Sequence, residues 1–468
     1  MSEHKECKTS KEQARVERSA LIVATVTSFM GPFMLSSVNI ALPAMEKDLQ
    51  LNTVQLSWIA TSYLLAMAVV LVPAGKLADI FGRKKLFAQG LFIYTIGSMV
   101  AVFANAFFVL IGARIIQGVG SALFVTTGMA ILTSIFPPEK RGKVIGVYVA
   151  AVYIGLSVGP FVGGLLAQHL GWRSIFFIML PMGIASLYLT LHYLKGEWYG
   201  EPGQQFDIGG GLLYAVAILS VVYGVTRIPT VIGFGLLAAG CLFFYIFIRH
   251  QLKAKFPVFE IQLFTTNKVF AFSSTAALLN YSATFAVTFL LSLYLQYVQG
   301  LSPQAAGTFL MAQPIVMAIL SPLAGRLSDT IEPRLLATAG MVVTVIGVSL
   351  LTMLTSTTPL FLIFADLILL GTGFALFSSP NMSAIMGAVE KRYYGLASGT
   401  VATMRLLGQM FSMALATVVL SLIVGEQPIT PEIYGAFLRS IHIVYILSAV
   451  FCLFGVYFSW FRGAVHSK

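Results

Sequence analysis

Long apolar runs, repeated from one end of the chain to the other, constrain this sequence more than any other feature. The chain has 468 residues, of which 57% are hydrophobic and only 10% are charged, whereas soluble domains are about 25% charged. Each run is about 20 residues long, enough for a helix to cross the ~30 Å hydrocarbon core of a bilayer. In that core an isolated segment satisfies its backbone hydrogen bonds only as a helix. The sequence therefore predicts an all-α, multi-span membrane protein.

Fourteen transmembrane helices are predicted from these runs. The predicted spans are residues 19–43, 54–74, 86–106, 107–135, 144–167, 174–194, 208–226, 231–248, 269–297, 308–324, 335–354, 360–385, 396–424 and 441–460. Asp207, directly before the seventh span, is a typical N-cap residue for that helix. An even number of spans places both ends of the chain on the same side of the membrane.

The distribution of lysine and arginine predicts which side that is. With the N-terminus inside, the inner segments contain 23 of the 29 Lys and Arg residues, and the outer loops contain four. Because cytoplasmic loops are enriched in these residues, both ends are predicted to be cytoplasmic, in a multi-pass protein of the cell membrane. The net charge of +11 follows from the same loops and does not indicate nucleic acid binding.

The loop between the second and third spans concentrates charge in an otherwise apolar chain. Residues 75–85 read G-K-L-A-D-I-F-G-R-K-K and contain four cations and one acid. A weaker copy, G-R-L-S-D-T-I-E-P-R, begins at Gly325 and includes Asp329. The recurrence of such a loop predicts an internal repeat.

The repeat divides the chain into two similar halves with an insertion between them. Each half has six spans and one copy of the loop, and the seventh and eighth spans form the inserted pair. The predicted segments are a cytoplasmic tail over 1–18, an N-terminal bundle over 19–194, a linker with the inserted pair over 195–268, a C-terminal bundle over 269–460 and a second tail over 461–468.

Three further stretches contain recognisable patterns. The fourth span has R-x-x-Q-G-x-G-x-A from Arg114, and Y-L-Q from Tyr294 is followed by G-L-S-P at the end of the ninth span. The fifth span has a series of small residues and one proline, which are Gly155, Gly159, Pro160, Gly163 and Gly164. Glycines four residues apart form a flat stripe that lets a second helix come close. This series is interpreted as a hinge that opens or seals the outer side, or alternatively as ordinary small-residue packing.

Together these patterns resemble the Major Facilitator Superfamily, specifically its fourteen-helix drug:proton antiporter branch. The loop fits the superfamily pattern G-x-x-x-D-x-x-G-R-[RK]-[RK] at every fixed position, which are Gly75, Asp79, Gly82, Arg83, Lys84 and Lys85. The loop and its copy at Gly325 and Asp329 are interpreted as a cytoplasmic latch between the second and eleventh helices, or alternatively as a topology anchor only. The chain departs from the family at Met34, which stands where the first span often has an acid linked to proton coupling.

Three residues that are charged at neutral pH, two arginines and one aspartate, lie within predicted spans and are candidates for proton coupling. A cation at the centre of a span costs about 2.5–3.5 kcal/mol on insertion scales, so Arg114 and Arg405 are expected to face a cavity or a partner. Arg114 is interpreted as part of a proton relay, or alternatively as an anchor of helix packing or a side chain that reaches the outer face from near the end of the fourth span. Arg405 is interpreted as a cavity residue, or as a side chain that reaches the cytoplasmic face. Asp366 is a candidate proton carrier that replaces the missing acid and pairs with one of the arginines, or alternatively is solvated near the outer headgroups.

A larger set of side chains is predicted to line a central cavity, with aromatic belts and helix packing as the alternative. The members are Met34, Asn39, Tyr63, Gln117, Tyr153, Asn280, Tyr281, Tyr294, Gln296, Gln313, Asn381 and Gln409. An apolar, aromatic-rich cavity with few polar groups suits lipophilic ligands.

The sequence also indicates what is absent. It contains no nucleotide-binding loop of the G-x-x-x-x-G-K-[ST] type, which argues against an ATP-driven pump. Cys7, Cys241 and Cys452 have no metal-ligand spacing, so no metal site is expected. The polar segments between the spans are short, so no enzymatic activity is expected, and transport driven by a proton gradient would need no cofactor.

The resemblance implies a secondary transporter, expected to be a monomer, with a small molecule and protons as its partners in the bilayer. It would export lipophilic small molecules, cationic ones included, by proton antiport through alternating access. The alternative is an exporter or facilitator of one endogenous metabolite or lipid, without proton coupling through an acid in the first span.

Overall fold

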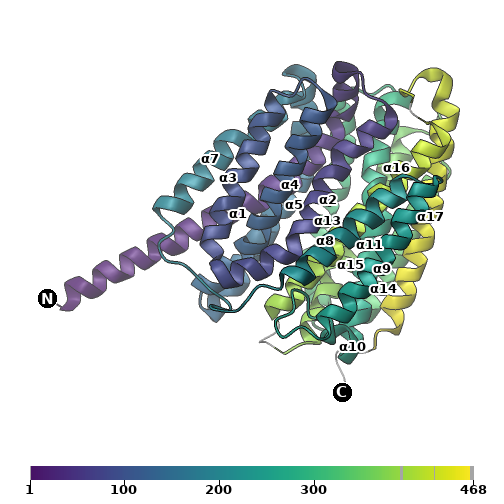
Figure 1. Cartoon of the computed structure of the whole chain (residues 1–468). Helices are drawn as coiled ribbons and strands as arrows, with labels where there is room; N and C mark the ends of the chain where they lie inside the picture. Colours follow the sequence, from purple (N-terminus) through teal and green to yellow (C-terminus); the bar gives the residue numbers. More distant parts are fainter. Residues whose placement is uncertain (1, 391–393, 426, 464–468) are drawn as a thin grey trace.

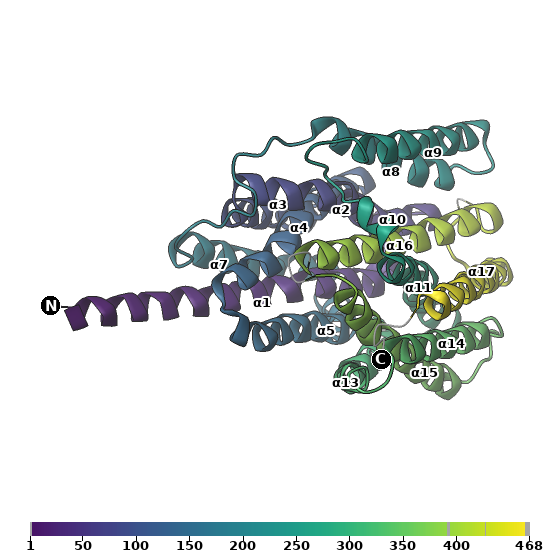
Figure 2. The same cartoon turned by 90° about the horizontal axis from the view of Figure 1, so that it is seen from below.

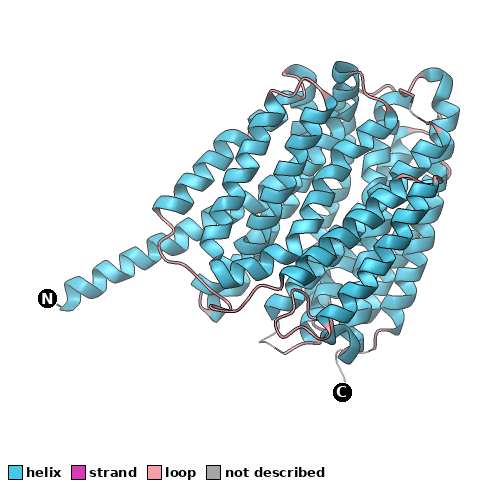
Figure 3. Ribbon diagram, in the orientation of Figure 1, coloured by secondary structure: helices cyan, strands magenta, loops and turns pink. Residues whose placement is uncertain are grey.

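The chain folds as a bundle of helices in the computed structural model, which describes residues 2–390, 394–425 and 427–463. Within these ranges the regular elements are all helices (Figure 3). Fourteen of the helical segments are long and apolar enough to cross a membrane, and they correspond in order to the fourteen predicted spans. The predicted all-α membrane fold is therefore confirmed.

The first six spans form the N-terminal bundle. Its helices are α1 (Ser2–Leu49), α2 (Thr53–Phe81), α3 (Arg83–Val102), α4 (Phe107–Ile135), α5 (Pro138–His169), α6 (Arg173–Phe177) and α7 (Met179–His192). The predicted sixth span is thus two helices, α6 and α7. Figure 1 shows the first turns of α1 projecting beyond the bundle. The face at which α1 begins and α17 ends is called the inner side below, and the opposite face the outer side.

The inserted pair consists of α8 (Ile208–Thr226) and α9 (Val231–Gln251), followed by the short α10 (Gln262–Thr266). Asp207 caps α8 as predicted, because its Oδ1 accepts a hydrogen bond from the Gly210 N–H at 2.8 Å. Figure 2 shows α8 and α9 side by side at one edge of the molecule.

The C-terminal bundle repeats the arrangement. Its helices are α11 (Lys268–Leu293), the π-helix η1 (Tyr294–Val298), α12 (Pro303–Leu310), α13 (Ala312–Leu327), α14 (Pro333–Leu351), α15 (Leu360–Gly387), α16 (Tyr394–Ile423), the short 3-10 helix η3 (Pro431–Ile433) and α17 (Tyr434–Phe461). The tenth span begins at Pro303 rather than at residue 308. Ser302 caps this helix by accepting from the Ala305 N–H at 3.2 Å, and proline is favoured at the first helical position.

The two bundles meet along an interface called the seam below, in which α1 packs on α11, α5 packs on the pair α12–α13, and α2 packs on α16. The hydrogen bonds that cross between the bundles lie toward the outer ends of the spans, within the part of the chain that the structure describes. Ser292 Oγ donates to the Asn39 carbonyl at 3.1 Å, and Gln296 Nε2 donates to the Ile40 carbonyl at 3.0 Å. The bundles are therefore joined on the outer side.

Candidate functional site

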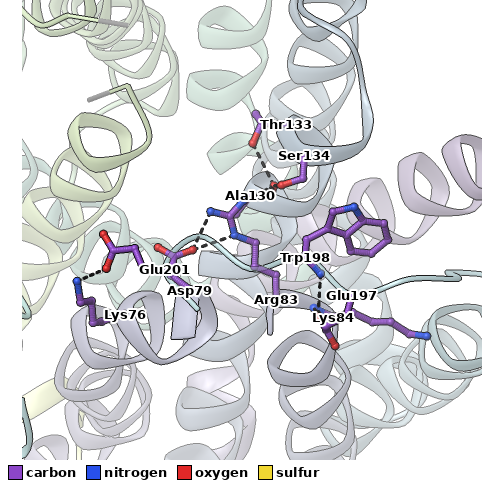
Figure 4. A network of polar contacts seen from close by, with 10 residues as sticks. All are labelled: Lys76, Asp79, Arg83, Lys84, Ala130, Thr133, Ser134, Glu197, Trp198 and Glu201. Carbon is purple, nitrogen blue, oxygen red and sulfur yellow. Dashed lines mark hydrogen bonds and ion pairs between the residues drawn. The ribbon is translucent and has the colours of Figure 1, made fainter. Parts of the chain in front are cut away.

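The charged segment 75–85 lies at the inner ends of α2 and α3 (Figure 4). Asp79 forms an ion pair with Arg83 one turn further on, with Nη2 at 2.7 Å and Nε at 2.9 Å from Oδ1. The other end of the Arg83 guanidinium reaches α4, where Nη1 donates to Ser134 Oγ at 2.6 Å and to the Ala130 carbonyl at 3.2 Å. Arg83 thus ties the turn between α2 and α3 to α4 of the same bundle.

The remaining partners of this segment come from the linker that follows α7. Glu201 forms an ion pair with Lys76, and the Glu197 carboxylate accepts from the backbone N–H of Lys84 at 2.7 Å. Among the described residues, the hydrogen bonds and ion pairs found for this segment do not reach α14, which is the eleventh span. The predicted cytoplasmic latch therefore stays a prediction, since the bundles are joined on the outer side in this conformation.

The weaker copy has fewer bonds than the first. Gly325 lets α13 approach α15, since a Cβ at this position would lie 2.8 Å from Ser379 Oγ. Ser328 Oγ is 3.1 Å from Ser383 Oγ, again between α13 and α15. Asp329 is exposed, and no bond of its carboxylate is found in the described part of the chain.

The glycine series of α5 has two faces with different partners. A Cβ on Gly155 would lie 2.7 Å from the Phe29 carbonyl, and a Cβ on Gly163 would lie 2.6 Å from the Ser37 Cα, so this face packs against α1. Gly159 packs on the same face, and its carbonyl accepts from Ser37 Oγ at 2.8 Å.

The other face of α5 crosses the seam to the C-terminal bundle. Gly164 lies against the Pro303 carbonyl of α12, and Gly307 of α12 lies against the Pro160 carbonyl of α5. Any side chain larger than hydrogen at Gly164 or Gly307 would collide with backbone atoms of the opposite bundle. The series therefore both builds the N-terminal bundle and permits closure of the outer side.

Arg114 is completely buried among α2, α3 and α4. Its guanidinium carbon lies 4.3 Å from the centre of the Tyr63 ring, Nε donates to the Ile59 carbonyl at 3.1 Å and Nη1 donates to Gln117 Oε1 at 2.9 Å. Gln117 in turn donates to Ser98 Oγ at 2.8 Å. Three predicted residues, Arg114, Tyr63 and Gln117, are thus brought together, but inside one bundle.

Arg405 occupies a different position, at the seam between the bundles. Its half-buried side chain interacts electrostatically with Tyr148 of α5 and with Tyr281 of α11. Tyr281 also interacts with Tyr153 of α5, and its ring packs edge-on against Phe374 at a centroid distance of 5.2 Å. Tyr153, Tyr281 and Arg405 are half-buried, and so is Gln409 one turn further along α16. Of the predicted cavity residues, Tyr153, Tyr281 and Arg405 therefore lie between the two bundles, as does Gln296, whose side chain bonds to the Ile40 carbonyl.

Asp366 is buried within the C-terminal bundle rather than at the seam. A Cβ on Gly347 of α14 would lie 3.3 Å from Asp366 Oδ1, and Tyr445 of α17 interacts electrostatically with the carboxyl group. Both carboxyl oxygens are buried without a hydrogen-bond partner among the described residues. Neither Arg114 nor Arg405 is an ion-pair partner of Asp366 in the described chain, because Arg114 belongs to the other bundle and Arg405 faces α5 and α11. The predicted pairing was wrong.

Several other predicted cavity residues lie elsewhere. Tyr294 is near the outer surface, where its hydroxyl donates to the Thr355 carbonyl at 2.6 Å. Asn381 is near the inner surface, where its Oδ1 accepts from Arg462 at 2.7 Å. The buried members with no described side-chain bond to the opposite bundle are Met34, Asn39 and Asn280, while Gln313 is half-buried on α13.

Two buried charged residues were missed by the sequence analysis. Glu46 lies on α1 beyond the predicted end of the first span, and its Oε1 is 3.4 Å from the Ile429 N–H of the opposite bundle. Arg462 was assigned to the cytoplasmic tail, yet its side chain is fully buried beside Ser273 and Asn381. The desolvation lowers the pKa of Arg462 to about 10. Neither residue stands in an apolar run, so hydropathy gave no signal for its burial.

A comparison with known protein families shows which family has this sequence and this arrangement of helices. The sequence profile described as "Major Facilitator Superfamily" matches residues 24–413 and 273–468. The chain belongs to the Major Facilitator Superfamily. The fold and family are those of transporters rather than enzymes, with helices suited to a membrane.

Relatives within the superfamily carry different names. The riboflavin transporter RibZ of Clostridioides difficile is 33% identical over 401 residues, covering 85% of this chain and 86% of the relative. The multidrug resistance protein Stp of Mycobacterium tuberculosis is 32% identical over 419 residues, covering 87% and 77%. The tetracenomycin C resistance and export protein of Streptomyces glaucescens is 28% identical over 414 residues, covering 87% and 76%.

Solved structures agree on the fold. The chain matches a bacterial homolog of the human lysosomal transporter Spinster, in an inward-facing and unoccupied conformation, with a TM-score of 0.70. The match covers 96% of this chain and 97% of that structure at 16% sequence identity. This likeness concerns the fold alone.

Proposed function

We propose that this superfamily member is a secondary transporter of the cell membrane that exports lipophilic, aromatic small molecules in exchange for protons, and that it belongs to the fourteen-helix drug:proton antiporter branch. The observation that carries the proposal is the half-buried group at the seam, made of Tyr153, Tyr281, Arg405 and Gln409. Aromatic rings and few polar groups between two bundles form the kind of site that binds flat, largely apolar ligands.

The charge of this group favours neutral and anionic substrates over cationic ones. Arg405 faces the seam, and Met34, where the family often has an acid, is buried and apolar. Arginine also stacks on aromatic faces, which suits ring systems with polar substituents. The cationic substrates expected from the resemblance are therefore less well supported by the site.

Asp366 is the proposed proton carrier. A buried carboxyl group with no partner is rare in membrane spans, and such residues commonly serve proton transfer. Its place inside the C-terminal bundle separates the proton site from the substrate group at the seam. Coupling would then arise because protonation changes the packing of α14, α15 and α17, with no direct competition between proton and substrate.

Uptake into proteoliposomes tests the substrate class. Three fluorescent aromatic probes of similar size, one cationic, one neutral and one anionic, are compared for wild type, Arg405→Gln and the control Arg439→Gln, whose side chain is exposed on the outer side. We expect transport of the neutral and anionic probes, loss of most of that transport in Arg405→Gln and no change in Arg439→Gln. Transport of the cationic probe alone, unaffected by Arg405→Gln, would contradict the proposal.

A second function, export or facilitated movement of one metabolite without proton coupling, is favoured by Met34. A relative that covers 85% of this chain is named a riboflavin transporter, an example of a specific aromatic substrate. Saturable transport of a single metabolite that is independent of pH, with no transport of the three probes, would support this second function instead.

A further inference from the structure

The inserted pair is joined to the N-terminal bundle by residues 197–201, called the strap below. The Glu197 carboxylate accepts from the first backbone N–H groups of α3, with Oε1 2.7 Å from Lys84 N and Oε2 3.1 Å from Lys85 N. A carboxylate is favourable there because the N-terminus of a helix carries unsatisfied N–H groups and a partial positive charge. Gly82 makes room, since a Cβ at this position would lie 2.6 Å from the Glu197 Cδ.

The backbone of the strap both accepts a hydrogen bond from the turn between α2 and α3 and donates hydrogen bonds to it. The Arg83 N–H donates to the Trp198 carbonyl at 2.9 Å. The Asp79 carbonyl accepts from the N–H groups of Gly200 at 3.0 Å and Glu201 at 2.9 Å. With the Lys76–Glu201 ion pair, the strap has directed bonds to both α2 and α3.

Helix α8 continues this attachment within the membrane. Figure 2 shows the inserted pair beside the bundles, and α8 packs on α2 of one bundle and on α16 of the other. The Tyr214 hydroxyl donates to the Ala68 carbonyl of α2 at 3.1 Å, and the rings of Tyr223 and Trp58 lie 6.1 Å apart near the outer end. Hydrogen bonds or ion pairs from α8 or α9 to α16 are not found among the residues described.

The inner ends of α8 and α9 are fastened to each other. Asp207 lies 2.9 Å from His250 Nε2 and accepts from Gln251 Nε2 at 2.8 Å, and Gln251 Oε1 accepts from the Phe259 N–H at 3.0 Å. Three residues later α10 begins, and its Phe264 ring packs both on Phe270 of the C-terminal bundle, at a centroid distance of 5.1 Å, and on Phe259, at 5.8 Å. The hydrogen bonds to the inserted pair therefore reach as far as Phe259, whereas α10 packs on the C-terminal bundle.

We propose that the strap, α8 and α9 move as one body with the N-terminal bundle, while α8 slides over α16 and the backbone turns between Phe259 and Gln262. The inference rests on the alternating access of the proposed function. When two bundles rotate against each other, a helix that packs on both slips along one of them. Apolar contacts permit slipping, whereas the directed bonds of the strap and of Tyr214 hold α8 to α2.

Distances between spin labels test this proposal, and the chain supplies one labelling site in Cys241, which is exposed on α9. In a background with Cys7→Ser and Cys452→Ala, Cys241 is paired with Met99→Cys on α3 or with Leu453→Cys on α17, both exposed. The second conformation is obtained with Gly164→Leu, or with Gly307→Leu if the first variant fails to fold, because either side chain prevents closure of the outer side.

The expected result is one constant and one changed distance. The Cys241–Met99 distance stays the same in both backgrounds, and the maximum of the Cys241–Leu453 distribution shifts. Glu197→Gln combined with Glu201→Gln broadens the Cys241–Met99 distribution, whereas Glu260→Gln, the same change beyond the inserted pair, leaves it sharp. A shift of the Cys241–Met99 distance between the two backgrounds would overturn the inference about the inserted pair and leave alternating access intact. No shift in either pair overturns alternating access as well.

Discussion

The guanidinium carbon of Arg114 lies over the Tyr63 ring, 4.3 Å from the ring centre. Both side chains are buried, one on α4 and the other on α2, and the cation has no carboxylate partner among the described residues. The attraction between a buried cation and an aromatic face is worth about 2 kcal/mol when both are desolvated. This contact therefore replaces an ion pair in holding α2 to α4.

Removing the ring is expected to destabilise the N-terminal bundle. Tyr63→Leu loses the contact with Arg114 and also the hydrogen bond to Ser121, whose Oγ lies 2.7 Å from the Tyr63 hydroxyl. Tyr63→Phe loses only the hydrogen bond, at about 0.5–1.5 kcal/mol. We expect the melting temperature of the purified protein to fall more for Tyr63→Leu than for Tyr63→Phe, and equal values would show that the ring does not support Arg114.

The two faces of the α5 glycine series are expected to respond differently to substitution. Gly163→Ala forces a Cβ to within 2.6 Å of the Ser37 Cα, and overpacking of this kind costs about 1–3 kcal/mol. Gly146→Ala on the same helix meets nothing within 4 Å and is the matched control. Thermal unfolding should show a lower melting temperature for Gly163→Ala than for wild type. Gly146→Ala should not lower the melting temperature, since alanine is a better helix former than glycine.

Gly164→Ala should act on transport rather than on stability. Its neighbour is the Pro303 carbonyl of the opposite bundle, so an added Cβ opposes closure of the outer side without touching α1. We expect Gly164→Ala to lower the transport rate and to leave the melting temperature equal to that of wild type. A large drop in melting temperature with normal transport per folded molecule would show that Gly164 serves packing alone.

Asp207 is expected to stabilise the inner ends of the inserted pair through its ionised form. Burial raises the pKa of Asp207, but hydrogen bonds from Gly210, His250 and Gln251 outweigh that effect and hold the pKa below its ordinary value. The stabilisation of the folded state by ionised Asp207 is therefore fully present above the unfolded-state pKa of this residue. It is lost as the pH falls through the folded-state pKa. Asp207→Ala also removes the cap of α8, which is worth about 1 kcal/mol.

A pH series on thermal unfolding checks this sign. The difference in melting temperature between wild type and Asp207→Asn should be largest near neutral pH and should shrink in acid. Asp207→Ala should be less stable than Asp207→Asn at every pH, because asparagine still caps the helix. A difference that grows in acid would contradict the assignment.

The transmembrane spans could be predicted from the sequence because a helix that crosses a bilayer needs about 20 apolar residues. It also identified Arg114, Asp366 and Arg405, since a charge within an apolar run stands out. The direction in which each points could not be predicted, because these helices are apolar on all sides. The structure places only Arg405 at the seam.

The strap could not be predicted for a different reason. Glu197 and Glu201 stand in a polar linker, where an acid has no pattern that distinguishes a solvated position from a bonded one. The position of Gly82 became meaningful only when Glu197 was found against it. Glu46 escaped notice because the predicted span ended at Pro43, whereas α1 continues through that proline to Leu49.

Transport driven by a pH gradient tests the central claim most directly. Purified protein in liposomes, acidic on one side, is given the neutral aromatic probe, and wild type is compared with Asp366→Asn and with the control Asp329→Asn, whose side chain is exposed on the inner side. We predict that wild type and Asp329→Asn move the probe against its gradient only while protons move the other way, and that Asp366→Asn loses this accumulation. Probe movement by wild type that is the same with and without the pH gradient would contradict proton antiport.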